Sequence, residues 1–325
     1  MADKAEVLVL SPKKTIEEGL EKGFVLHKLW TAPDREAFLD RVAPRVRAIA
    51  SAGGHAAVDA ALMSRLPKLE IVSTFGVGYD HVDAKWAGQH GITVTNTPDV
   101  LTEEVADTAI GLLLCTVREF PQAERFLRAG KWLDKNYRLS PATLRNRTVG
   151  IIGLGRIGRA IARRLDAMLV PVVYHGRNRQ PDVPNRYYDN LIAMARDADV
   201  LLAIAPGGPG TNNMINAEVL NALGPDGIVI NMARGSLVDE PALIKALQEK
   251  RIFAAGLDVF VDEPTVPPEL IAMDNVVLFP HLGSASLHTR QAMDQLVVDN
   301  LVAWAAGNPP LTPVPETPWP PSGRR

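Results

Sequence analysis

Short apolar runs alternate with helix-forming segments along almost the whole sequence, and this alternation restricts the fold more than any other feature. The runs are rich in valine, isoleucine and leucine, and their apolar residues are consecutive rather than interleaved with polar ones. Strands of that kind are buried on both faces, which happens when a parallel sheet carries helices on both sides. The sequence therefore predicts doubly wound α/β structure.

The alternation runs through the chain twice. Strands of the first set are expected at 7–10, 24–30, 46–50, 69–75 and 92–95. Six more are expected at 149–153, 170–175, 200–206, 227–233, 252–260 and 275–281. A length of 325 residues also exceeds what a single hydrophobic core usually supports. We therefore expect two domains.

Two long helices mark the borders between the two sets of strands. An apolar helix is expected at about 102–119, and an amphipathic helix at about 284–306 follows the last strand. If the last helix packs back onto the first unit, that unit is discontinuous in sequence. The expected domains are then residues 1–100 plus 284–325 and residues 101–283.

Charge and composition exclude several classes of partner. The 35 basic and 37 acidic residues leave a formal charge of −2, which favours neither nucleic acid nor an anionic membrane. No uninterrupted apolar stretch of about 18 residues occurs, and the first residues lack the apolar core of a signal peptide. The one cysteine, Cys115, allows neither a disulfide nor a cysteine metal cluster within one chain, and we expect it to be a small buried hydrophobe. We expect a cytoplasmic protein with a small-molecule partner and no metal.

A glycine pattern, G-x-G-x-x-G, follows the strand at 149–153 and precedes a helix. Gly153 permits a tight turn, Gly155 lets the backbone approach a pyrophosphate, and Gly158 permits close packing of the helix. Amides at the helix start then face the phosphates. The pattern alone could be a plain tight turn, but in this context it predicts a dinucleotide site formed by Gly153, Leu154, Gly155, Arg156, Ile157 and Gly158.

The next strand ends in the segment VVYHGRNR at 172–179, about twenty residues further on. In this binding mode an acid at that position accepts hydrogen bonds from the adenosine ribose, yet no acid occurs between Asp166 and Asp182. Arg177, Asn178 and Arg179 stand there instead, and guanidinium groups suit a phosphate dianion. The segment favours NADP(H) over NAD(H), although solvated loop arginines are the alternative.

The tail at 308–321, NPPLTPVPETPWPP, holds seven of the 25 prolines. It cannot form a regular helix or a central strand. A strap lying on the surface is the preferred interpretation over a partner-binding motif.

Further motifs lie at strand ends, where open parallel sheets bind ligands. Together with the glycine loop, they resemble the D-2-hydroxyacid dehydrogenase family over nearly the whole chain. The motifs are GVGYDHVD (76–83), LTEEVADTAIGLLL (101–114), NMARGSLVDEPAL (231–243), GLDVFVDEP (256–264) and FPHLGSAS (279–286). The resemblance implies a flavodoxin-like substrate domain, which acts as a lid, and a Rossmann dinucleotide-binding domain.

The resemblance also implies a catalytic set. Arg234 would orient the substrate, Glu263 would be the acid partner, and His281 would donate the proton. These roles are physically reasonable, because a guanidinium binds a carboxylate with two prongs and an imidazolium can protonate a keto oxygen beside it. Each residue alone could instead be structural, as a strand cap, a turn acid or a satisfied histidine.

Other roles follow from the same resemblance. The amides of Val77 and Gly78 would bind the substrate carboxylate, in a cleft that closes between the domains. Asp258 would hold the nicotinamide carboxamide. Further cofactor neighbours would be Pro206, Thr211, Ala233 and Gly283, although the GGPG between the first two departs from commoner family versions.

Within the family the motifs look most like those of NADPH-dependent glyoxylate and hydroxypyruvate reductases. The expected reaction reduces a small 2-keto acid to the D-2-hydroxy acid with NADPH. Larger 2-keto acids such as aryl pyruvates are the alternative, and a nucleotide-sensing corepressor is an alternative from another class. A homodimer is expected through the helix from Thr102 and the connector 118–141. Trp132 on that connector could reach the partner's site or simply pack within the chain.

Overall fold

The computed structural model describes residues 4–53 and 56–320. The described chain divides into two compact units. Unit 1 combines the residues up to Leu101 with those from Ser286 onward, and unit 2 is Thr102–Ala285. These borders lie within two residues of the positions expected from the sequence.

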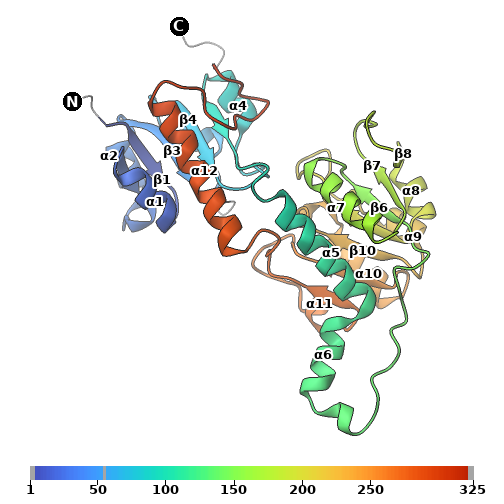
Figure 1. Cartoon of the computed structure of the whole chain (residues 1–325). Helices are drawn as coiled ribbons and strands as arrows, with labels where there is room; N and C mark the ends of the chain where they lie inside the picture. Colours follow the sequence, from blue (N-terminus) through green and yellow to red (C-terminus); the bar gives the residue numbers. More distant parts are fainter. Residues whose placement is uncertain (1–3, 54–55, 321–325) are drawn as a thin grey trace. The chain divides into compact units, whose positions relative to one another are not determined.

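Unit 1 is built on a five-stranded parallel sheet with the order β2-β1-β3-β4-β5 (Figure 1). This is the flavodoxin-like order. The strands are β1 (Glu6–Val9), β2 (Val25–Lys28), β3 (Val46–Ser51), β4 (Ile71–Thr74) and β5 (Thr93–Thr95). The helices are α1 (Lys14–Glu21), α2 (Arg35–Val42), α3 (Ala60–Ser64), α4 (Ala84–Gln89) and α12 (Leu287–Ala305), with a 3-10 turn η1 (Leu29–Thr31).

Helix α12 comes from the far end of the chain and packs on α1 and β4. Its backbone joins the sheet layer directly, because the buried Ser73 hydroxyl donates to the Val297 carbonyl oxygen at 3.2 Å. Three shorter helices begin at aspartates whose side chains accept backbone amide hydrogen bonds, which is the usual N-cap arrangement. Unit 1 is therefore discontinuous in sequence and closed by α12.

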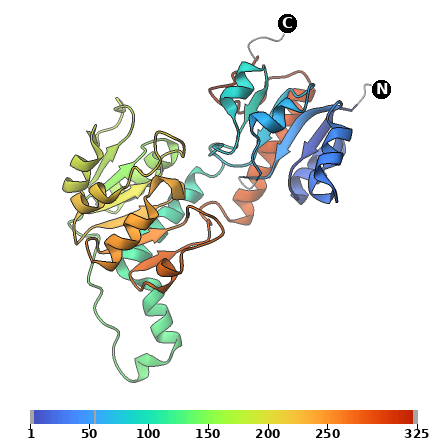
Figure 2. The ribbon, with the colours of Figure 1, turned by 180° about the vertical axis from the view of Figure 1, so that it is seen from behind.

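Unit 2 carries a seven-stranded parallel sheet with the order β12-β11-β10-β9-β6-β7-β8 (Figure 2). The strands are β6 (Val149–Ile152), β7 (Val172–His175), β8 (Arg186–Tyr188), β9 (Val200–Ala203), β10 (Ile228–Asn231), β11 (Ala254–Leu257) and β12 (Val276–Leu278). The order reverses between β6 and β9, and ligands of such sheets bind beyond the strand ends at this switch point. The prediction of two doubly wound parallel-sheet units is confirmed.

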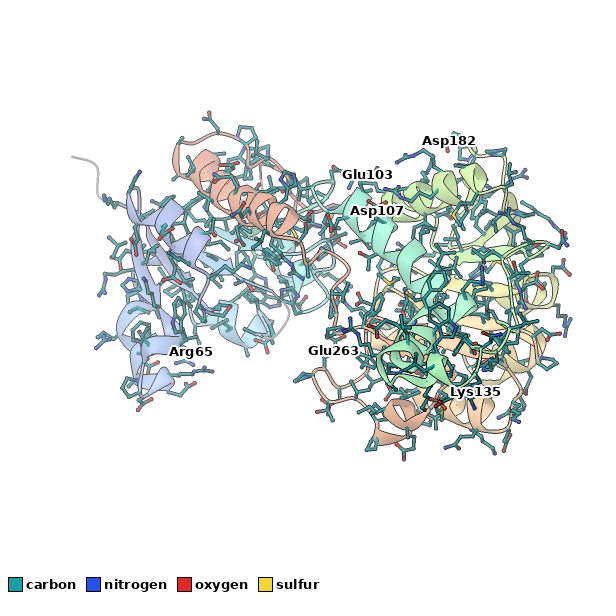
Figure 3. The ribbon with its side chains drawn as sticks, turned by 60° about the horizontal axis from the view of Figure 1, so that its bottom comes forward. Arg65, Glu103, Asp107, Lys135, Asp182 and Glu263 are labelled. Atoms are coloured by element: carbon teal, nitrogen blue, oxygen red, sulfur yellow. The ribbon has the colours of Figure 1, made fainter. Side chains whose placement is uncertain are left out.

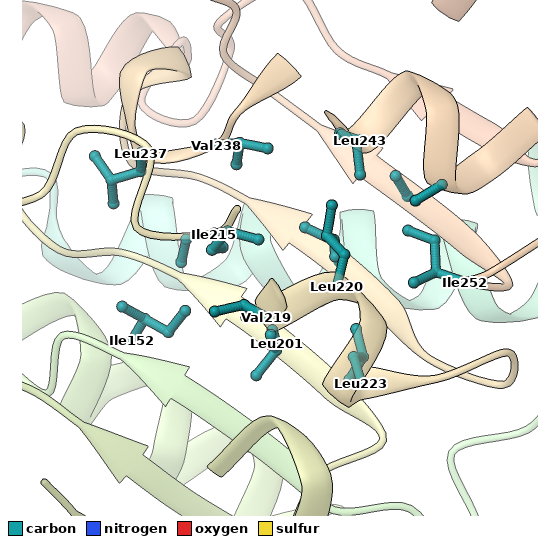
Figure 4. Close-up of a cluster of buried hydrophobic side chains, with 14 of the residues drawn as sticks. Ile152, Leu201, Ile215, Val219, Leu220, Leu223, Leu237, Val238, Leu243 and Ile252 are labelled. Carbon is teal, nitrogen blue, oxygen red and sulfur yellow. The ribbon is translucent and has the colours of Figure 1, made fainter. Parts of the chain in front are cut away.

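Helices cover both faces of the second sheet. The helices of unit 2 are α5 (Thr102–Arg118), α6 (Phe120–Arg128), α7 (Arg156–Ala167), α8 (Leu191–Asp197), α9 (Ala217–Leu223), α10 (Glu240–Gln248) and α11 (Pro268–Ala272), with 3-10 turns η2 (Lys131–Leu133) and η3 (Gly235–Leu237). A core cluster fills the layer beside α9 and α10 (Figure 4). It includes Ile152, Leu201, Val219, Leu220 and Leu243, each at most 3% exposed. This packing fixes the strand ends that carry the site.

Ion pairs attach α5 to α7, whose first turn belongs to the glycine loop. Glu103 pairs with Arg163 at 2.7 Å and with Arg164 at 2.9 Å. Asp107, one turn along α5, pairs with Arg164 at 2.7 Å (Figure 3). These exposed pairs contribute little stability individually, but together they orient α7.

Strand β8 was not expected from the sequence. It is a three-residue edge strand, Arg186–Tyr188, beside β7. Its polar first residue and its short length hide the apolar pattern that marked the other strands. Cys115 also differs from its expectation, because it is only half-buried on α5, where burial raises the pKa of its thiol.

The proline-rich tail is more than a surface strap. The Val314 amide donates to the Val94 carbonyl at 2.9 Å, and Thr95 forms an antiparallel bridge with Pro313. Val314 and Thr317 are each only 2% exposed. The tail therefore covers β5, which would otherwise be an open edge of the sheet. Its last proline, Pro321, lies outside the described residues.

An arm, defined here as residues 120–139, projects from the rest of unit 2 in both views (Figures 1 and 2). Helix α6 has no buried residue. Trp132 is 62% exposed and Leu133 is 93% exposed, so of the two possibilities left open for Trp132 the structure does not show packing in the interior of its own chain. Among the described residues, no helix is long and apolar enough to cross a membrane.

Candidate active site

The glycine loop joins β6 to α7 through backbone contacts that leave no room for side chains at Gly153 and Gly158. Gly153 has φ +99°, and a Cβ there would lie 2.7 Å from the Ala205 Cα. A Cβ on Gly158 would overlap the Gly153 carbonyl oxygen. Gly155 is exposed, and a Cβ there would meet nothing within 4 Å. The loop thus has a tight inner side and an open outer side at the start of α7, which is the arrangement that a pyrophosphate needs.

The loop after β7 presents arginines to solvent. Arg177, Asn178 and Arg179 are all exposed, and neither arginine forms an ion pair with any residue in the described part of the chain. The Tyr187 hydroxyl donates to the Gly176 carbonyl at 3.0 Å, which fixes the beginning of the loop. Two unpaired guanidinium groups therefore stand beyond the strand next to the glycine loop.

The far side of this loop is tied to α7. Arg159 donates to both carboxylate oxygens of Asp182, at 2.6 and 2.8 Å, and to Gln180 Oε1 at 2.9 Å. The Gln180 amide donates to the Tyr174 hydroxyl at 2.7 Å. The Arg159 hydrogen bond lowers the pKa of Asp182 to about 2. Asp182, the first acidic residue after Arg177 and Arg179, is therefore already paired with Arg159.

His281 and Glu263 form a direct pair. His281 Nδ1 lies 2.7 Å from Glu263 Oε2, and Glu263 Oε1 accepts the Phe260 amide at 3.0 Å. Burial raises the pKa of Glu263, but hydrogen bonds from His281 and Phe260 outweigh it, and the pKa lies below its ordinary value. A charged carboxylate at Nδ1 orients the ring and leaves Nε2 without a partner among the described residues.

Arg234 follows β10. In the sheet, β11 separates β10 from β12, the strand that precedes His281. The residue after Arg234, Gly235, packs so closely on the Phe260 backbone that a Cβ would overlap the carbonyl group. The positive charge of Arg234 also contributes to lowering the pKa of Glu263. The structure thus brings Arg234, Glu263 and His281 together at one end of the unit 2 sheet.

Asp258 holds the backbone around His281. It is 2% exposed, and its carboxylate accepts the Leu282 amide at 2.7 Å and the Gly283 amide at 2.9 Å. Burial raises its pKa, although these two hydrogen bonds oppose the shift. The His281 amide donates to the Asp258 carbonyl at 2.9 Å. These bonds fix His281 at φ +52°, a conformation that residues with side chains seldom adopt.

Two loops complete the surroundings. The Thr211 hydroxyl donates to the Pro206 carbonyl at 2.8 Å, so the unusual GGPG forms a closed turn beyond β9. The Thr108 hydroxyl donates to the Gly283 carbonyl at 3.2 Å, which links α5 to the His281 segment. Val77 and Gly78 belong to unit 1, in the loop that follows β4.

The NAD binding domain of the D-isomer specific 2-hydroxyacid dehydrogenases matches residues 110–283. This chain belongs to the D-isomer specific 2-hydroxyacid dehydrogenase family. The match spans the glycine loop and the motifs of Arg234, Glu263 and His281, and the resemblance predicted from the sequence is confirmed.

Named members of the family resemble the chain over almost its full length. A hydroxyphenylpyruvate reductase of Plectranthus scutellarioides is 45% identical over 309 residues, 95% of this chain and 98% of its own. A glyoxylate/hydroxypyruvate reductase A of Arabidopsis thaliana has the same identity and coverage. The crystal structure of an NADPH-dependent glyoxylate/hydroxypyruvate reductase from Sinorhizobium meliloti, in complex with NADP and malonate, superposes with a TM-score of 0.91 at 47% identity, covering 99% of each chain.

Sequence reasoning missed one residue of this D-2-hydroxyacid dehydrogenase site. Asn231, 1% exposed at the end of β10, accepts the Ala233 amide at 3.1 Å and donates to the Arg234 carbonyl at 2.9 Å. Its side chain therefore shapes the turn that presents Arg234. The only signal in the sequence was a polar residue at the end of an otherwise apolar strand.

Proposed function

We propose that this chain reduces a small 2-keto acid, such as glyoxylate or hydroxypyruvate, to the D-2-hydroxy acid with NADPH. The observation that carries the proposal is the 2.7 Å pair of His281 and Glu263 beside Arg234. Membership of the family and the names of the similar glyoxylate/hydroxypyruvate reductases support it.

The residues at the β6 to α7 turn fit a dinucleotide. The open backbone at Gly155 and the first turn of α7 suit the pyrophosphate, and the tight turn at Gly153 leaves space for it. When bound, NADPH would supply the hydride. Other residues proposed to line the cofactor site are Leu154, Arg156, Ile157, Gly158, Pro206, Thr211, Ala233, Asp258 and Gly283. For Asp258 the carboxamide role would add to the two backbone bonds it already accepts, which a carboxylate can do.

Preference for NADPH is proposed to come from the loop after β7. Arg177 and Arg179 are exposed and form no ion pair among the described residues, so a 2′-phosphate would meet free donors. Asn178 between them adds an uncharged donor. NADH lacks that phosphate and would leave the two guanidinium groups without a partner.

The chemistry on the substrate follows from the three polar side chains. The Arg234 guanidinium would bind the carboxylate with two hydrogen bonds and polarise the adjacent keto oxygen. His281 would give its Nε2 proton to that oxygen as charge develops there. Glu263 would keep the Nδ1 proton in place and stabilise the charged ring. The amides of Val77 and Gly78 are proposed to bind the substrate carboxylate as well.

Two alternatives can be compared. Reduction of larger 2-keto acids has weak support from the name of one relative, a hydroxyphenylpyruvate reductase, because a glyoxylate/hydroxypyruvate reductase is equally similar at 45% identity. A hydrophobic pocket discriminates a single extra methylene by only ~1 to 3 kcal/mol, so the preferred substrate has to be measured. A nucleotide-sensing corepressor has no need of Arg234, Glu263 and His281 in one place, so the complete set argues against it.

We propose further that the protein is a cytoplasmic homodimer. A free cysteine suits a reducing compartment. The arm exposes a group of large apolar side chains that a second copy would cover, namely Phe120, Leu127, Trp132, Leu133 and Leu139. In a dimer Trp132 could reach the partner's substrate site.

The test is a steady-state matrix of glyoxylate, hydroxypyruvate, pyruvate and phenylpyruvate against NADPH and NADH. We expect the highest kcat/KM with glyoxylate or hydroxypyruvate and NADPH. A phenylpyruvate maximum would favour the aryl alternative. If none of the four acids leads to NADPH consumption, the proposal that the protein is an enzyme is wrong.

A further inference from the structure

Among the described residues, the loop Gly76–Gly78 is hydrogen-bonded on one side only, to the segment that follows β5. The Gly76 amide donates to Thr97 Oγ1 at 2.9 Å, and the Thr97 amide donates back to the Gly76 carbonyl at 2.9 Å. The Asn96 side-chain amide donates to the Val77 carbonyl at 2.8 Å. The Gly76 carbonyl, which precedes the Val77 amide, therefore accepts a bond from Thr97. The Val77 carbonyl, which precedes the Gly78 amide, accepts a bond from Asn96.

Peptide planarity turns these bonds into an orientation. In a trans peptide the carbonyl and the following N–H point in opposite directions. Because the Gly76 and Val77 carbonyls point toward residues 96 and 97, the N–H groups of Val77 and Gly78 point away from them. Neither N–H has a hydrogen-bond acceptor within residues 4–53 or 56–320. Two adjacent free donors directed to the same side suit a carboxylate.

Asn96 is in turn held by the C-terminal tail. The Thr312 hydroxyl donates to the backbone carbonyl of Asn96 at 2.6 Å, and the backbone amide of Asn96 donates to the Thr312 carbonyl at 3.3 Å. Asn300, fully buried on α12, binds Thr312 through both atoms of its side-chain amide, at 2.9 and 3.0 Å. A chain of hydrogen bonds thus runs from α12 through the tail to the loop after β4.

We propose that Asn96 is a positioning residue for the substrate carboxylate, and that Thr312 of the tail supports it. Asn96 fixes the Val77 peptide so that the amides of Val77 and Gly78 face the carboxylate together. The proposal rests on the proposed function, and it gives the proline-rich tail a part in substrate binding.

The first test is Asn96→Ala. The KM for glyoxylate and the dissociation constant of oxamate, a carboxylate analogue that is not reduced, should each rise about tenfold, the effect of one misdirected hydrogen bond. The oxamate constant is measured by calorimetry with NADPH present. The affinity for NADPH, measured by fluorescence, should stay unchanged because Asn96 lies in unit 1. A merely structural asparagine would lower the melting temperature without this selective loss.

Two further variants sharpen the result. Thr312→Val keeps the side-chain shape and removes only the hydroxyl, so it should raise the same two constants by a smaller factor, and it tests the proposal even if Asn96→Ala folds poorly. Asn308→Ala makes the matched change at an exposed asparagine outside the network, and it should alter neither constant.

The proposal is overturned if Asn96→Ala and Thr312→Val bind oxamate as tightly as the wild type. It is also overturned if NADPH affinity falls as much as oxamate affinity does. These outcomes differ from a failure of the proposed function, in which the wild type itself reduces none of the 2-keto acids.

Discussion

At the scale of single residues, the site depends on how backbone hydrogen bonds aim a few side chains. His281 adopts a left-handed conformation that Asp258 stabilises through the Leu282 and Gly283 amides. Asn231 shapes the Arg234 turn in the same way. The motifs predicted Arg234, Glu263 and His281 as candidates, and the structure brings these three residues together. The supporting bonds of Asn231 and Asp258 could not be predicted, because they depend on loop conformations that leave no periodic pattern in the sequence.

The pH dependence should follow the charge on Glu263. The pKa of Glu263 lies below the ordinary value of 4.5, so its carboxylate stays charged between about pH 8 and about pH 5. The negative charge is lost only below that range. Glu263→Gln removes the negative charge beside His281 Nδ1. We expect kcat/KM for glyoxylate reduction by the wild type to fall below about pH 5, as the Glu263 carboxylate gains a proton, and we expect this acid limb to be absent from the lower, flat profile of the variant. A profile that coincides with that of the wild type would show that the pair has no part in proton donation.

Cofactor preference belongs to the same scale. Arg177→Ala removes one exposed guanidinium that has no partner among the described residues. The ratio of kcat/KM for NADPH over NADH should fall about 10- to 100-fold, which corresponds to one lost charge-assisted hydrogen bond. The value for NADH should change little, because NADH carries no 2′-phosphate. An unchanged ratio would place the selector elsewhere.

At the scale of elements, continuous apolar runs predicted nearly every strand, and helical patterns predicted both long helices. Strand β8 was not predicted, because it is short, begins with a polar residue, and as an edge strand needs less apolar surface. The tail was predicted only as an irregular strap, since prolines mask the pairing of Val314 with Val94. Its role at the edge of β5 depends on a partner strand more than two hundred residues away, which local patterns do not reveal.

The loop that carries the two arginines is itself held by α7, which gives a prediction at this scale. Arg159→Met breaks the bonds to Asp182 and Gln180 and leaves Arg177 and Arg179 in place. An exposed ion pair contributes little stabilisation, so we expect the ratio of kcat/KM for NADPH over NADH to fall by only about two- to fivefold. The same kinetic comparison of NADPH and NADH measures it. A loss as large as that of Arg177→Ala would mean that Arg159 contacts the cofactor itself.

At the scale of the whole molecule, the residues proposed to act on cofactor and substrate are distributed over the two units. Unit 2 holds the glycine loop and the three polar side chains, and unit 1 holds the loop of Val77 and Gly78. The resemblance to the family implied the same assignment of these residues to two domains. Sequence patterns alone did not predict that the arm would leave Trp132 exposed, because exposure depends on what a segment meets in space.

Assembly can be tested through the arm. The double variant Trp132→Ser with Leu133→Glu places polar and charged groups on its most exposed apolar part. We expect light scattering to show a shift from dimer to monomer at micromolar concentration, because an interface core tolerates an unpaired charge poorly. Leu169→Glu, also exposed but outside the arm, serves as the control and should leave the mass unchanged. A monomeric wild type would contradict the dimer proposal.

The most direct test of the central claim is the turnover of NADPH with glyoxylate by the wild type and by His281→Asn. Asparagine keeps the polarity and approximate size of the ring but cannot supply its proton. We predict that the wild type consumes NADPH and that kcat in the variant falls about 10²- to 10⁴-fold, while the dissociation constant of NADPH is unchanged. A variant that turns over glyoxylate as fast as the wild type would contradict the account.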